Sequence, residues 1–101
     1  MVGRIWHGWT TPEKADAYEQ LLRSEVLPGI HRVEGYQGAY LLRQNAGAEV
    51  EFVTVTLFDS MEAVRQFAGE DYLAAVVPPA ACQLLSHFDE TSLHYEVLMT
   101  P

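Results

Sequence analysis

Two histidines stand among aliphatic and aromatic residues near the two ends of the chain. His7 lies in the stretch Val2–Trp9 and His94 lies in the stretch Thr91–Met99. An imidazole in an apolar pocket can take a proton from a phenol or quinol, because its pKa lies near neutrality. The resulting electron-rich anion can reduce dioxygen without a cofactor. His7 and His94 are therefore candidate catalytic residues; the alternative is that both are hydrogen-bonded histidines of a sheet.

Aromatic side chains are frequent enough to form the walls of a pocket for a flat ligand. For most of them, packing in the core is the better explanation. Three are retained as candidates for substrate binding: Trp6, Phe67 and Tyr72. Arg43, near the end of a predicted strand, can hold a carboxylate or a quinone oxygen. Its alternative role is an exposed ion pair with Glu49 or Glu51 across a hairpin, which contributes only about 0–1 kcal/mol.

Metal and thiol chemistry find little support in the sequence. The four histidines show no HxH, HExxH or HxxxH spacing. Cys82 is the single cysteine, and its apolar neighbours predict a packed structural thiol. Ser60 has no His/Asp companion and is predicted to cap a helix. We expect neither a metal nor another cofactor.

The chain has 101 residues, which predicts a single domain over residues 1–101. Its net charge of −8 argues against binding to nucleic acid or to an anionic membrane surface, because both would repel it. There is no N-terminal signal sequence and no apolar run long enough to span a bilayer. A cytoplasmic location is the resulting expectation.

The candidate residues must be positioned by strands and helices that alternate along the chain. Strands are predicted at Val2–Trp9, Tyr36–Arg43, Val50–Phe58 and Thr91–Met99. Helices are predicted from Pro12 to about Val26, where Pro28-Gly29 ends the first, and from Ser60 to Gly69. Shorter helical pieces are predicted at Tyr72–Val77 and Ala80–His87. The order βαββαβ predicts an α+β, ferredoxin-like fold, a four-stranded antiparallel sheet with two helices on one face.

The open face of this sheet is predicted to be apolar. Neighbouring strand residues such as Ile5 and Trp6, or Phe52 and Val53, are both apolar although they point to opposite faces. The strand Val50–Phe58 reads as buried on both faces. A large apolar patch marks an interface. We therefore expect a homodimer that pairs through the open sheet face.

Three segments carry a resemblance to a known family: IWHGWTTPEKADAYEQLL, EFVTVTLFDSMEAVRQFAGED and LHYEV. With the element order, they resemble the antibiotic biosynthesis monooxygenase-like family from Val2 to Val97. The resemblance implies a dimeric α/β barrel and a cofactor-independent monooxygenase acting on a small aromatic or quinol-like substrate. The alternative is a non-catalytic or stress-related protein of the same fold that binds a small ligand.

The resemblance also bears on haem degradation, which some members of this family perform. These relatives carry an Asn on the first strand, a Trp on the second helix and an axial His about ten residues later. The nearest positions here are His7, Phe67 and Val77. Because Val77 cannot ligate iron, the resemblance disfavours haem degradation for this chain.

Overall fold

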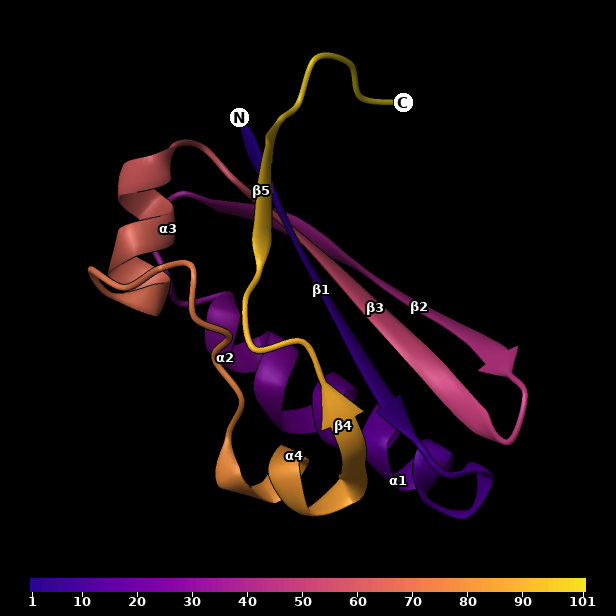
Figure 1. Cartoon of the computed structure of the whole chain (residues 1–101). Coiled ribbons are helices and arrows are strands. Elements are labelled where there is room, and N and C mark those ends of the chain that lie inside the picture. The colour runs from indigo at the N-terminus through magenta and orange to yellow at the C-terminus, as the bar shows by residue number, and fades with distance from the viewer.

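An antiparallel five-stranded sheet forms the centre of the computed structural model, which describes residues 1–101 (Figure 1). Its strands are β1 (Val2–Thr10), β2 (Tyr36–Ala46), β3 (Glu49–Phe58), β4 (Leu85–Phe88) and β5 (Leu93–Glu96). The order across the sheet is β2-β3-β1-β4, and β5 pairs with another part of β1. This is the strand arrangement of the predicted ferredoxin-like fold. The sheet is open, with β2 at one edge.

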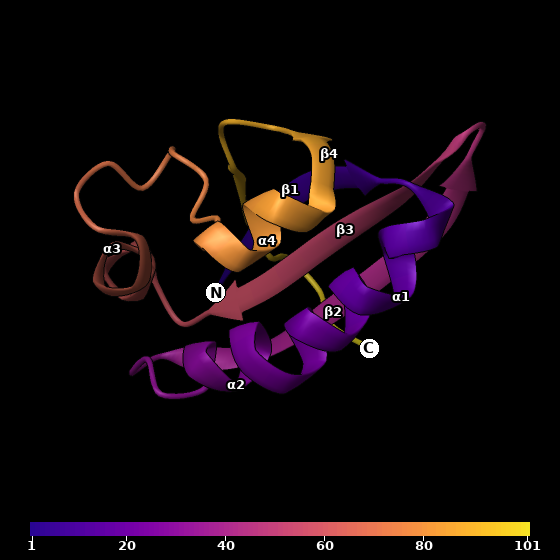
Figure 2. The same ribbon diagram turned by 90° about the horizontal axis from the view of Figure 1, so that it is seen from below.

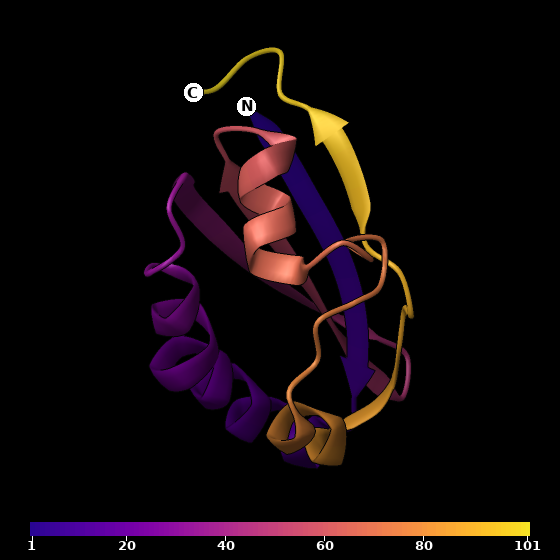
Figure 3. The same ribbon diagram turned by 90° about the vertical axis from the view of Figure 1, so that its left-hand side faces the viewer.

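Helices cover one face of the sheet (Figures 2 and 3). They are α1 (Pro12–Leu21), a π-helical segment η1 (Leu22–Val26), α2 (Leu27–Ile30), α3 (Met61–Ala68) and α4 (Pro79–Leu84). None of them is long and apolar enough to cross a membrane. Two buried apolar clusters lie between helices and sheet, one centred on Tyr18 and Phe52 and the other on Phe58 and Val64.

The first helical run is longer than predicted. It continues through Pro28 to Ile30, so the predicted end at Pro28-Gly29 is wrong. In the π-helical segment the amide of Leu27 donates to the carbonyl of Leu22, five residues earlier. Proline has no amide hydrogen and its ring clashes with the carbonyl four residues before it in a regular helix. A wider π turn directly before Pro28 relieves both problems and lets the helix continue.

The predicted start and end of α3 are confirmed. The Ser60 hydroxyl accepts a hydrogen bond from the amide of Ala63 at 3.3 Å, and Ser60 itself has extended backbone angles. Gly69 closes the helix with a φ of 85°, a conformation that glycine adopts at little cost. These contacts satisfy backbone groups that a helix end leaves unpaired.

Replacing Ser60 with alanine is expected to destabilise the protein by about 1 kcal/mol, because the amide of Ala63 loses its partner. Urea unfolding followed by circular dichroism measures this. Ser24→Ala is the matched control, since the exposed Ser24 hydroxyl only donates to the Gln20 carbonyl within a helix. Equal losses in the two variants would contradict a capping role for Ser60.

The C-terminal third departs most from the predicted elements. Residues 72–77, predicted as helical, form a loop in which Ala74 makes an isolated bridge with Thr91. The helix predicted for Ala80–His87 ends at Leu84, and the following residues form β4. The predicted final strand Thr91–Met99 is limited to β5. The edge of β1 that faces away from β3 pairs with β5 over Val2–Ile5 and with β4 over Gly8–Thr10. This pairing satisfies backbone groups of β1 and overrides the local helix propensity of the segment that forms β4.

Burial alternates along β3. Val50, Phe52 and Phe58 are buried against the helices, whereas Val53 and Val55 on the other face are only half-buried. The expectation of a strand buried on both faces is therefore met on the helix side only within this chain. The opposite face of the sheet, without helices, is called the open face below.

Candidate functional site

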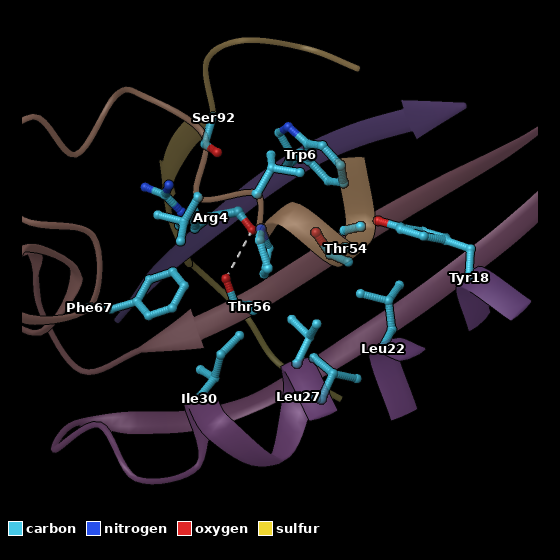
Figure 4. A pocket seen from close by; sticks show the side chains of 15 residues that line it. Arg4, Trp6, Tyr18, Leu22, Leu27, Ile30, Thr54, Thr56, Phe67 and Ser92 are labelled. Atoms are coloured by element: carbon cyan, nitrogen blue, oxygen red, sulfur yellow. Dashed lines mark hydrogen bonds between the residues drawn. The ribbon is translucent and has the colours of Figure 1, made fainter. Parts of the chain in front are cut away.

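A mainly apolar cavity of about 60 Å³ lies between the sheet and the first helical run (Figure 4). Beside it, a groove of about 340 Å³ lies between this run and the segment 76–80. The cavity and the groove share five residues: Val26, Ile30, Phe67, Val76 and Pro78. Glu25 is the one carboxylate among the residues that line either of them. The cavity and the groove together form a concave, mostly apolar site, as is usual for the binding of a small molecule.

Strand β1 supplies one wall of the cavity. Side chains alternate between faces along a strand, so Arg4 and Trp6 both point toward the helices (Figure 4). The Trp6 indole is held by a hydrogen bond from its Nε1 to the Asp89 carbonyl at 2.7 Å. Gly8 gives the ring its space, because a Cβ atom there would lie 2.7 Å from the Trp6 ring. The sequence Trp6-His7-Gly8 therefore sets this wall.

Helix α1 supplies Tyr18 on another side of the cavity (Figure 4). Its side chain is 1% exposed and its ring meets Phe52 edge-on, with centroids 4.9 Å apart. Burial raises the pKa of the Tyr18 hydroxyl well above its usual range, and the nearby Cys82 adds to the shift. The hydroxyl therefore stays protonated near neutral pH. Three further hydroxyls line the cavity: Thr54, Thr56 and Ser92.

Arg4 brings a positive charge to the cavity wall, and it is 4% exposed. Its Nη1 donates to the Tyr72 carbonyl at 2.5 Å and to His94 Nε2 at 2.8 Å, and its Nη2 donates to the Ala74 carbonyl at 3.0 Å. Burial lowers the pKa of the guanidinium. Our sequence analysis did not select Arg4. The available signal was a lone basic residue in an apolar strand, two positions before Trp6 and hence on the same face.

The two histidines lie on opposite faces of the sheet. His94 is directly opposite Arg4 in the β1–β5 pairing, and cross-strand partners share a face. His7 is three residues from Arg4 and therefore points to the open face. Neither histidine is among the residues that line the cavity.

His7 belongs to a polar and aromatic cluster on the open face. Its Nδ1 lies 3.0 Å from a carboxylate oxygen of Glu51, which also accepts a hydrogen bond from Gln44 at 2.7 Å. The bond from Gln44 and then that from His7 hold the pKa of Glu51 below its usual value. The ring of Trp9 stacks on His87 at 4.7 Å and lies 6.1 Å from the His7 ring.

Of the four predicted binding residues, Trp6 and Phe67 line the cavity. Tyr72 lies behind Arg4, accepting its hydrogen bond through the backbone carbonyl, while its ring meets His94 edge-on at 5.4 Å. Arg43 lies outside the cavity, where its Nη1 is 3.0 Å from carboxylate oxygens of both Asp16 and Glu19. It thus ties β2 to α1 and does not pair across the β2–β3 hairpin.

The sequence model of the antibiotic biosynthesis monooxygenase family matches residues 1–78, more than three quarters of the chain. The chain belongs to this family. No curated protein sequence matches it. As a member of the antibiotic biosynthesis monooxygenase family it shares its fold with several solved structures.

A putative antibiotic biosynthesis monooxygenase from Bacillus cereus is 14% identical, with a TM-score of 0.69, covering 99% of this chain and 95% of that one. SnoaB, a cofactor-independent oxygenase from Streptomyces nogalater, is 19% identical, with a TM-score of 0.64 and coverages of 98% and 94%. The haem degrader MhuD from Mycobacterium tuberculosis is 21% identical, with a TM-score of 0.62 and coverages of 100% and 99%. At these identities the likeness shows the fold, and the activity must be argued from the site.

Haem does not fit this site in the antibiotic biosynthesis monooxygenase chain. No histidine, cysteine or methionine lines the cavity to serve as an axial ligand, and the one tyrosine that does, Tyr18, keeps its hydroxyl proton because burial raises its pKa. Val77, at the position that the family resemblance matches to an axial histidine, forms part of the apolar wall.

Proposed function

We propose that the protein is a cofactor-independent monooxygenase that acts on a small aromatic or quinol-like substrate in the cavity between sheet and helices. The observation that carries this proposal is the character of the cavity: it is mostly apolar, has aromatic walls and holds a buried cation. Apolar walls suit a ring system, and a few polar groups orient it. Trp6 and Phe67 are the proposed substrate-binding side chains.

The proposed reaction needs only substrate and dioxygen. A phenol that loses its hydroxyl proton becomes electron-rich at the ring carbon opposite the oxygen, and that carbon bonds to dioxygen. The O–O bond then breaks. One oxygen stays on the ring as a carbonyl, the second leaves as water with two hydrogens from the substrate, and the phenol becomes a quinone. Dioxygen is thus the oxidant, and the cavity contributes a dry site and a fixed orientation.

His94 is proposed as a positioning residue, because it contacts the guanidinium of Arg4 and does not line the cavity. Tyr72 has the same role through its carbonyl. No step at the cavity follows for His7, whose side chain is on the other face of the sheet, or for Arg43, which holds α1. We further propose that the protein is a cytoplasmic homodimer whose two open faces pack together, since exposed apolar side chains such as Tyr40 and Leu42 lie there.

Oxygen uptake tests the monooxygenase proposal. An oxygen electrode would screen naphthols and naphthoquinols against the purified protein in buffer without added cofactor. Val26 lines both the cavity and the groove, so Val26→Phe narrows both of them. A steric cost of about 1–3 kcal/mol predicts a roughly tenfold or larger loss of uptake. Leu98→Phe, at an exposed site beyond β5, is expected to leave uptake unchanged.

A non-catalytic ligand-binding function is the second candidate. The observation that favours it is the absence of an imidazole or carboxylate from the inner cavity, which leaves no side chain to act as a general base there. In that case naphthols would bind saturably and Val26→Phe would weaken binding, but no oxygen would be consumed. Uptake that is equal in the wild type and Val26→Phe would contradict the assignment of this cavity as the site.

A further inference from the structure

We propose that the cavity takes its aromatic ligand as an oxyanion, with an ionised ring hydroxyl bound to the guanidinium of Arg4. This inference rests on the proposed function of the cavity as the ligand site and adds the chemical class of the ligand, an acidic phenol or enol.

Arg4 is a buried charge without a carboxylate partner. The ion pairs of the structure involve Arg23, Arg43 and two histidines on the surface, and none involves Arg4. Its hydrogen-bond partners are two backbone carbonyls and an imidazole, and its Cζ lies 5.7 Å from the centroid of the Phe67 ring; none of these groups carries a net negative charge. Buried arginines are almost always paired, because taking an unpaired charge out of water is costly. The protein has 14 acidic residues, yet none of them neutralises this site.

The guanidinium of Arg4 also has N–H groups that make no hydrogen bond within the protein. Arginine has five N–H groups. Three are used, two on Nη1 and one on Nη2, which leaves the Nε hydrogen and one Nη2 hydrogen. Among the fully buried side-chain nitrogen and oxygen atoms, only His94 Nδ1 has no hydrogen-bond partner. Arg4 Nε has no partner either, so it cannot be fully buried and must be accessible from the space around it. Two adjacent nitrogens with free hydrogens form the arrangement that binds an oxyanion.

The neighbours of Arg4 leave its charge uncompensated. Arginine only donates, so His94 Nε2 must accept and the proton of this imidazole is on Nδ1. Burial and then the charge of Arg4 hold the pKa of His94 below its usual value, which keeps His94 neutral. Among the residues that line the cavity and the groove, Tyr18 keeps its hydroxyl proton because burial raises its pKa, and Glu25 makes no hydrogen bond to Arg4.

An ionised hydroxyl fits these features better than a neutral one. It supplies the missing negative charge, and the mainly apolar walls lower the local polarity, which strengthens the attraction. A cation within about 4–6 Å lowers the pKa of an acid by about 1–3 units. The cation would therefore let a bound phenol ionise at a pH about 1–3 units lower than the free phenol, and the anion is the form that reacts with dioxygen. The same cation explains how a cavity without a base can still carry out the proposed reaction.

Binding of 4-nitrophenol tests the inference, because its phenolate absorbs visible light and its ionisation can be followed directly. It is a single-ring probe, smaller than a naphthol. Titration with wild-type protein at several pH values should give a pKa of the bound probe at least about one unit below that of the free probe. This corresponds to a phenolate that binds about tenfold more tightly than the phenol. Nitrobenzene and 4-nitrobenzoate serve as the neutral and the carboxylate probe.

Arg4→Met should lower the ratio of phenolate to phenol affinity by about tenfold or more, and it should leave the affinity for nitrobenzene unchanged. Arg4→Lys, which keeps the charge, should restore part of the preference. Arg32→Met removes one exposed positive charge outside the cavity and should change nothing. Circular dichroism checks the fold of each variant, and if Arg4→Met does not fold, the bound pKa in the wild type and Arg4→Lys still decide.

The outcomes separate this inference from the proposed function. Equal binding of phenol and phenolate, or a preference that persists in Arg4→Met, would overturn the role of Arg4 while the cavity remains the ligand site. A preference for 4-nitrobenzoate over the phenolate would replace the ring hydroxyl by a carboxylate and overturn the stated ligand class. If none of the three probes binds to the wild type, or if Val26→Phe binds them as tightly as the wild type does, the cavity itself fails as the ligand site.

Discussion

Leu42→Glu is expected to dissociate the proposed homodimer into monomers. Leu42 is 49% exposed on the open face, opposite Val53, and Tyr40 and Leu93 lie on the same face with comparable exposure. If the open faces of two copies pack together, the new carboxylate would be buried without a partner. The cost of an unpaired buried charge is about 3–5 kcal/mol, which weakens the dimer by about a hundredfold or more.

Sedimentation velocity over a range of protein concentrations would measure this change. Leu73→Glu is the matched control: Leu73 is 54% exposed, but it lies in the loop between α3 and α4, away from the open face. The control should remain dimeric. A wild type that sediments as a monomer, or a Leu42→Glu variant that stays dimeric, would show that this face is not the interface.

The features that could be predicted from the sequence depend on few neighbouring residues. Ser60 and Gly69 bound α3 as predicted, because a cap is a contact within one turn of chain and a positive φ is a property of one residue. The strand order followed from the alternation of strands and helices, since few topologies connect such elements. These predictions needed no knowledge of distant contacts.

The features that could not be predicted depend on contacts between distant segments. Two short strands, β4 and β5, lie near the C-terminus because each pairs with a different part of β1. Nothing local in the sequence around Leu85 signals the pairing of β4. The length of the first helix depends on a π turn before Pro28, whereas proline is read locally as a stop. In both cases the tertiary environment decides between conformations that the local sequence allows.

The faces of the strands, and hence which candidates can share one cavity, could be predicted from the sequence only in part. Trp6 and His7 are adjacent in a strand, so they point to opposite faces and cannot both line one cavity. This rule alone separates His7 from the site that contains Trp6. The relation of His94 to Arg4 was not accessible, because it depends on the register of the short strand β5.

The largest loss of stability is expected for Phe52→Ala. The Phe52 side chain is fully buried, with Tyr18 edge-on against its ring and the guanidinium of Arg43 5.5 Å from the ring centroid. Removing a buried phenylalanine costs about 3–5 kcal/mol, through lost transfer free energy and the cavity left behind. Because a domain has only about 5–15 kcal/mol of stability, the loss should lower the urea midpoint severely.

Phe88→Ala is the comparison for this variant, since Phe88 is half-buried on β4 and loses less apolar area. Phe52→Ala should also loosen Tyr18, because the Tyr18 ring rests on Phe52 and its other side faces the ligand cavity. Binding of 4-nitrophenol at a urea concentration where the variant is still folded would detect this. Phe52→Leu, which keeps most of the volume, should retain most of the stability and the binding. Equal losses for Phe52→Ala and Phe88→Ala would mean that the core does not centre on the Tyr18–Phe52 contact.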